Sequence, residues 1–173
     1  MARIVYKAGY EGQNKLECIE GIEIELLNGQ KALIYPKYAE KALLERKKVN
    51  EWRAPELSEI EALMRSCAEA DTHDLIVLGS PAAEWVRQFR SDAVGTNFNL
   101  PTLLAAMEIQ YQKKEIDALA EKIKGADLLR DYTSVVWACS KFKETLGWSV
   151  SGNVGYSAGS YIDSLYLSVP VIL

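Results

Sequence analysis

The side chains that most often carry out catalysis are few and scattered in this sequence. The single histidine, His73, has no second histidine or nucleophile beside it, so we expect a surface turn before a strand. Cys139 lies in an apolar run, where a thiol is inert and packs in the core. The three cysteines form no CxxC pair, which argues against a disulfide framework or a structural zinc site.

Acidic side chains are abundant, but they form no recognisable catalytic pair. Glu108, Glu115, Asp117 and Glu121 fall among lysines along helical stretches, a pattern typical of a solvated helix face. The phosphate-binding, zinc-protease, serine-hydrolase and EF-hand motifs are absent from the sequence. We therefore expect a protein without a catalytic site, a cofactor or a bound metal ion.

Residues 147–166 combine aromatic and small polar side chains, interrupted by glycines that permit tight turns. Recognition surfaces favour this mixture, because rigid rings give a large contact area and small polar groups give adaptable hydrogen bonds. The structural alternative is a pair of loops between terminal strands, with some tyrosines packed inward. On the binding interpretation, the ligand contacts are Trp148, Ser149, Ser151, Asn153, Tyr156, Ser157, Tyr161 and Asp163.

The composition is that of an ordinary globular chain. Its 173 residues are 49% hydrophobic and 25% charged, enough to bury a core without disulfides or metals. The net charge of −4 argues against a non-specific nucleic-acid binder, which needs a basic field. No stretch has the apolar length of a membrane span, and the N-terminus lacks a signal-peptide core. We therefore expect a cytoplasmic protein that neither binds nucleic acid nor inserts into membranes.

Strand patterns dominate the first 36 residues. Residues 3–6 could begin a strand, and the alternation of isoleucine with glutamate over residues 22–26 predicts a half-buried one. Asn28-Gly29 predicts a type I′ turn that leads into a partner strand over 32–35. Helices are expected over 38–48 and 52–64, and a short buried strand over 74–78.

Helix signals follow in the middle of the chain. Ser80 and Pro81 are expected to begin a helix that runs to about residue 90, and 91–99 should form a loop. Thr102 should begin another helix, with a break near 113–115 and an end at Gly125. Later strands are expected at 135–139, 147–150 and 165–173, with 151–164 as connecting loop.

Helices in the middle and strands at both ends predict an α+β fold whose termini meet in one antiparallel sheet. No linker-like composition divides the chain, so we expect a single domain over residues 1–173.

The C-terminal half resembles the DUF1566-like bacterial domains. Asn97-Phe-Asn-Leu-Pro-Thr-Leu103 and the helix after it are similar to the family's Leu-Pro-Thr helix. Residues 132–142 resemble its Tyr-Trp-Ser-Ser-Thr-Glu strand, and 166–171 resemble its closing strand. The match covers about 79–173; residues 1–78 would add an N-terminal strand, the hairpin and a helical insertion.

The resemblance implies a C-type-lectin-like fold, in which a twisted antiparallel sheet joins both termini and helices flank it. The family is common in gut Bacteroidetes and their phages and includes variable receptor-binding proteins. By analogy, the helices over 81–90 and 102–113 are scaffold and 148–164 presents the ligand surface. The calcium–sugar motifs of animal C-type lectins are absent, so we expect calcium-independent binding.

Two functions follow as hypotheses. The first is a non-enzymatic recognition module that binds a glycan or a surface protein through the aromatic, Ser/Gly/Asn-rich C-terminal segment. The alternative is a phage or prophage structural or assembly protein that acts as a homo-oligomer and belongs to the phage particle. An enzyme is a third possibility, since perturbed carboxylates cannot be recognised in a sequence.

Overall fold

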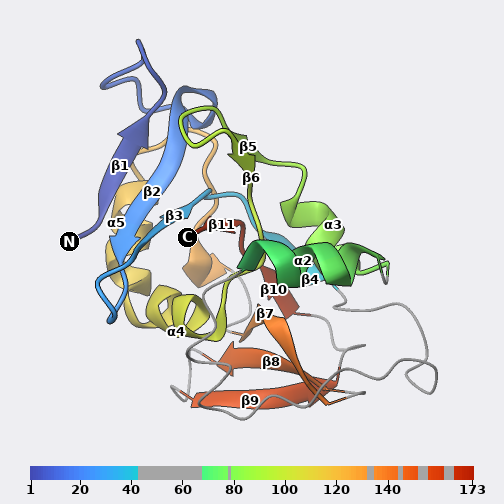
Figure 1. Cartoon of the computed structure of the whole chain (residues 1–173). Helices are drawn as coiled ribbons and strands as arrows, with labels where there is room; N and C mark the ends of the chain where they lie inside the picture. Colours follow the sequence, from blue (N-terminus) through green and yellow to red (C-terminus); the bar gives the residue numbers. More distant parts are fainter. Residues whose placement is uncertain (43–67, 78, 132–134, 144–145, 152–155, 162–165) are drawn as a thin grey trace.

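The computed structural model describes residues 1–42, 68–77, 79–131, 135–143, 146–151, 156–161 and 166–173. Within these ranges the chain forms the predicted α+β arrangement, with helices packed against mostly antiparallel strands (Figure 1). A C-type-lectin-like fold within this class stays a prediction.

The first sheet joins the two ends of the chain, as the sequence predicts. Its strand order is β1-β2-β3-β11, and every neighbouring pair is antiparallel. The strands are β1 (Arg3–Tyr6), β2 (Ile19–Glu25), β3 (Lys31–Ile34) and β11 (Val171–Ile172).

The predicted hairpin is confirmed as β2–β3, but its turn differs from the prediction. Leu26 N donates to Gln30 O at 2.8 Å and Gly29 N donates to Leu26 O at 2.9 Å, which makes a three-residue loop. Of the two residues expected at positive φ, Gly29 takes it, at 79°. The register pairs Ile22 with Ile34 and buries both, and this pairing requires the longer loop.

The second sheet has the order β4-β10-β7-β8-β9 and is antiparallel except for the parallel pair β10–β7. Its strands are β4 (Ala39–Ala42), β7 (Val135–Lys143), β8 (Leu146–Ser151), β9 (Tyr156–Tyr161) and β10 (Tyr166–Ser168). The predicted strand over 165–173 is therefore two strands, β10 and β11, which belong to different sheets. Pro170 lies between them and cannot donate a ladder hydrogen bond.

Two segments that were predicted to be helix and loop form the edge strands of this sheet. Residues 39–42 were expected to be helical, but they form β4 because Ala42 and Ala39 pair with Tyr166 and Ser168 of β10. The rest of that predicted helix and the one over 52–64 lie outside the described residues. The expected loop over 151–164 contains β9, which pairs along its whole length with β8. In both cases pairing with a distant strand outweighs local propensity.

The expected strand over 74–78 is wrong as far as the structure describes it. Residues up to 77 belong to the helix α2 (Ala68–Val77), and residue 78 lies outside the described ranges. A short apolar run fits a strand and a helix equally well by periodicity. Here Leu75 is buried while Val77 is 72% exposed, as on a helix that buries one face. His73 is exposed as expected, but on this helix rather than in a turn.

Local capping signals correctly predict the starts of two helices. Ser80 Oγ accepts from Ala83 N at 3.2 Å and begins α3 (Pro81–Val86), which ends before the predicted residue 90. Thr102 Oγ1 accepts from Ala105 N at 3.2 Å and begins α4. The predicted break falls at Gln112, between α4 (Leu103–Tyr111) and α5 (Lys113–Ala120).

Several short elements complete the arrangement. The expected loop over 91–99 is a small hairpin of strands β5 (Arg90–Ser91) and β6 (Thr96–Asn97). The described residues include the 3-10 helices η1 (Leu16–Cys18) and η3 (Leu129–Asp131). Buried Asp117 of α5 holds the start of η3, because its carboxylate accepts from Leu129 N at 2.7 Å and Arg130 N at 3.1 Å.

Helices cover both faces of the second sheet near β7. Val136 and Ala138 belong to the main core with α4, α5 and the first sheet. Trp137 and Cys139 belong to a second cluster with α2 and α3. This alternation is the two-residue period of a strand buried on both faces. On the side of the main core, β8 packs beside α4 (Figure 1). Strand β8 belongs to the part of the sequence that was predicted to bind a ligand.

Candidate ligand-binding site

The β8–β9 hairpin carries most of the predicted ligand contacts. Trp148, Ser149 and Ser151 lie on β8, and Tyr156, Ser157 and Tyr161 lie on β9. The register places Ser151 opposite Tyr156 and Trp148 opposite Gly159. The remaining predicted contacts, Asn153 and Asp163, lie outside the described residues.

Ser149 and Ser151 are the two predicted contact serines on β8, and their side chains lie in different surroundings. Ser149 is 3% exposed and pairs with Trp137 of the central strand, so it faces the cluster beneath α2 and α3. Ser151 is half-buried and lines a pocket. Of these two serines, only Ser151 therefore borders a space that a ligand could enter.

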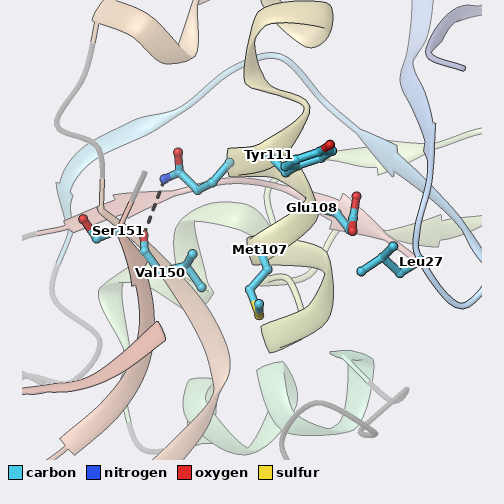
Figure 2. Close-up of a pocket in the computed structure, with 7 residues that line it drawn as sticks. Leu27, Met107, Glu108, Tyr111, Val150 and Ser151 are labelled. Atoms are coloured by element: carbon cyan, nitrogen blue, oxygen red, sulfur yellow. Dashed lines mark hydrogen bonds between the residues drawn. The ribbon is translucent and has the colours of Figure 1, made fainter. Parts of the chain in front are cut away.

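This pocket, of about 370 Å³, lies between α4, the end of β8 and the β2–β3 turn (Figure 2). It is lined by Leu27, Met107, Glu108, Gln110, Tyr111, Val150 and Ser151. Its volume is within the range of small-molecule sites, about 300–1,000 Å³.

The apolar part of the lining contains unusually exposed side chains. Tyr111 is 87% exposed and Leu27 is 83% exposed, which places two large apolar groups in water on one side of the pocket. Met107 lies deeper, beside the core, and Figure 2 shows it between Val150 and Leu27. A flat ring and flexible apolar groups around a pocket suit a ligand with an apolar face.

The polar part of the lining is held by hydrogen bonds. Glu108 is only 6% exposed, and its Oε2 accepts from Gln112 Nε2 at 2.8 Å. The same Gln112 nitrogen donates to Glu25 O at 2.8 Å, which ties the break between α4 and α5 to β2. Gln110 Nε2 donates to Val150 O at 3.5 Å and ties α4 to β8. These bonds orient the Glu108 carboxylate and connect three elements around the pocket.

The expectation that Glu108 and Asp117 lie on a solvated helix face is wrong. Both carboxylates are buried, whereas Glu115 and Glu121 are exposed as predicted. A signal for Glu108 is present in the sequence: α4 reads Leu-Leu-Ala-Ala-Met-Glu-Ile-Gln-Tyr, with apolar residues on nearly every side. A helix that is apolar on all sides is buried in the core. Acidic residues are rarely buried, so an acidic residue within such a helix is a candidate functional residue. The pocket contacts from α4 and Leu27 were not predicted.

A second, smaller hollow of about 250 Å³ lies on the exposed side of the first sheet and includes Glu23. Arg3 and Lys31 form ion pairs with Glu23 at 3.0 and 3.1 Å. The Arg3 hydrogen bond, opposed by partial burial and helped by Lys31, lowers the pKa of Glu23 below its ordinary value. Here the acidic charge is already balanced by the protein itself.

Further observations on the described residues concern metal ligands, membrane spans and cysteines. No group of three or more His, Cys, Asp or Glu side chains within the described ranges could hold a metal ion. Among the described helices, none has the length and apolar character to cross a bilayer. The two described cysteines, Cys18 and Cys139, are buried, as expected for thiols that pack in the core. Comparison of the chain with protein-family models, curated proteins and solved structures gives no match.

Proposed function

We propose that this protein is a non-enzymatic recognition module that binds a glycan in the pocket between α4 and β8 without calcium. The observation that carries the proposal is the lining of this pocket. An exposed tyrosine ring, a buried carboxylate and the hydroxyl of Ser151 border one space, and Ser151 belongs to the predicted C-terminal surface.

This lining suits a sugar ring for chemical reasons. A sugar has hydroxyl groups around its edge and C–H bonds on its faces. Tyr111 and Leu27 offer apolar contacts to a face. The carboxylate of Glu108 accepts hydrogen bonds, and the hydroxyl of Ser151 can both donate and accept them. On this proposal, α4 is part of the binding site as well as a scaffold, and a contribution of the aromatic residues of β8 and β9 stays a prediction.

The test is binding of the purified protein to a broad glycan array and to intact bacterial cells, with and without EDTA. Tyr111→Ala should weaken binding at least about tenfold, equivalent to about 1.4 kcal/mol. Its free energy of unfolding should change by less than about 0.5 kcal/mol, because the ring is exposed. Tyr10→Ala is the matched control, since Tyr10 is an exposed tyrosine that does not line the pocket.

A Tyr156→Ala/Tyr161→Ala variant tests the contribution of β9 in the same assay. Loss of binding with unchanged stability would support a contact between the ligand and at least one of these tyrosines. A large loss of stability would instead assign those rings to packing. EDTA should leave binding unchanged, and absence of binding to both glycans and cells would refute the proposed function.

Assembly is the second candidate, because β9 is the end strand of its sheet within the described residues. Its sequence, Tyr-Ser-Ala-Gly-Ser-Tyr, contains no charged residue and no proline. Natural edge strands usually carry charged residues or proline, which prevent pairing with another chain. Light scattering distinguishes the candidates: a stable trimer or larger ring favours assembly, including the phage-associated role, and a monomer favours a free-standing binding module.

A further inference from the structure

The buried carboxylates of this protein differ in how well their charge is balanced. Glu20 is 2% exposed and accepts three hydrogen bonds, from Ser91 Oγ, Asp92 N and Ala93 N. Asp117 accepts two backbone N–H bonds at the start of η3. In both cases the donors belong to another segment of the chain, which the carboxylate holds in place. These two groups therefore have a structural role that accounts for their burial.

Glu108 has no comparable set of partners. Its side chain accepts one hydrogen bond, from the neutral amide of Gln112. Within the described residues, no lysine or arginine forms an ion pair with it, and Oε1 accepts no hydrogen bond. Glu23 on the first sheet is the opposite case, since two cations pair with a carboxylate that is much less buried. A buried carboxylate without a cation is costly unless something else balances its charge.

The pocket gives a ligand access to this carboxylate. Glu108 lines it together with the apolar side chains of Leu27, Met107 and Tyr111. Figure 2 shows the Glu108 carboxylate between Tyr111 and Leu27. Glu108 itself is only 6% exposed, so the interaction of a ligand group with its carboxylate is stronger than at an open surface. An aromatic ring beside the carboxylate also favours a cation, because the ring face attracts positive charge.

We propose that the ligand of this pocket carries a protonated amino group, which pairs with Glu108 while the rest of the ligand packs on Tyr111, Met107 and Leu27. This inference rests on the proposed function and narrows the ligand class to glycans with free amino groups, such as unacetylated hexosamines. Neutral glycans offer hydroxyl donors to Glu108 but leave its charge unbalanced, so they should bind more weakly.

The experiment compares two probes that differ in the amino group. Titration calorimetry in mildly acidic buffer, in which hexosamine amines are protonated, measures binding of a chitosan oligosaccharide, which has free amines, and a chitin oligosaccharide of equal length, which is N-acetylated. The unmodified protein should bind the amine form at least about tenfold more tightly. This comparison changes only the ligand, so it does not depend on whether a variant folds.

Glu108→Gln tests the same interaction from the protein side. The substitution keeps the size of the side chain and an oxygen for Gln112, and it removes the charge. It should weaken binding of the amine form at least about tenfold and change binding of the acetylated form by less than about threefold. Glu84→Gln, at an exposed position of α3 outside the pocket, is the matched control and should change neither.

Two failures are distinguishable. Equal binding of both probes, or equal weakening of both by Glu108→Gln, would overturn the amine inference and leave the glycan-binding proposal intact. If the protein binds neither probe, no glycan on the array and no bacterial cells, both the amine inference and the proposed glycan binding are overturned.

Discussion

Glu20 ties the first sheet to the β5–β6 hairpin, and its substitution by glutamine tests the packing of the whole N-terminal half. Its Oε2 accepts from Ser91 Oγ at 2.6 Å and from Asp92 N at 3.1 Å, and its Oε1 accepts from Ala93 N at 3.2 Å. Ser91 Oγ in turn accepts from Val94 N at 3.2 Å. One carboxylate on β2 thus holds a turn that lies more than 70 residues away in the sequence.

The structure allows the cost of Glu20→Gln to be estimated. The amide has one acceptor atom, so it can satisfy either the two donors at Oε2 or the one at Oε1. The NH₂ group replaces the other oxygen and therefore faces a hydrogen-bond donor that it cannot accept from. At least one hydrogen bond to a charged group is lost. Such bonds contribute about 1.5–3 kcal/mol each. Because the remaining bonds also lose their charge assistance, we expect a loss of about 2–4 kcal/mol.

The assay is equilibrium unfolding in urea at neutral pH. Ser91→Ala removes the hydroxyl from the same network and should cost about 1.5–3 kcal/mol. The double variant should cost less than the sum of the two, because both substitutions break the same contact. Glu17→Gln is the control at a nearby exposed glutamate and should change stability by less than about 0.5 kcal/mol. A Glu20→Gln variant that unfolds at the same urea concentration as the parent would refute this account of the buried carboxylate.

Two further substitutions test the first sheet. Glu23→Gln should cost about 0.5–1 kcal/mol at neutral pH, the usual range for partly exposed ion pairs. Since the folded-state pKa of Glu23 lies below its ordinary value of 4.5, the stabilisation is present above that value and lost as the pH falls below it. The difference between parent and variant should therefore vanish in acid, and a constant difference in urea titrations at several pH values would contradict the assignment. Gly21→Ala should cost about 1–3 kcal/mol, because a Cβ there would lie 2.6 Å from Ile34 O. Thermal unfolding measures it, and an unchanged midpoint would show that the β2–β3 pair can shift apart without cost.

Features set by neighbouring residues were predictable from the sequence. Ser80 and Thr102 cap the helices they precede, because a hydroxyl can reach an amide three residues further along. The alternation over 22–26 and the Asn-Gly that follows it indicate the β2–β3 hairpin, although the register of the isoleucines decides the loop length. The apolar run at 135–139 predicts a buried strand, and β7 contains it.

The candidate site depended on contacts that no local pattern encodes. Ser151 was predicted from composition, and it lines the pocket only because β8 packs beside α4. Glu108 was assigned to a solvated face from its charged neighbours along the chain. Its burial follows from the apolar surroundings that α4 meets in the core.

The sequence by itself determined the α+β class, the capped starts of α3 and α4, the β2–β3 hairpin and the meeting of both termini in one sheet. Periodicity and capping are short-range, so they act wherever the chain places them. The tertiary structure alone decided that residues 39–42 and 156–161 become edge strands and that Glu108 opens into a pocket. Strand pairing and burial are free-energy balances between residues far apart in the chain, and a polar side chain is buried or exposed only once its neighbours are in place.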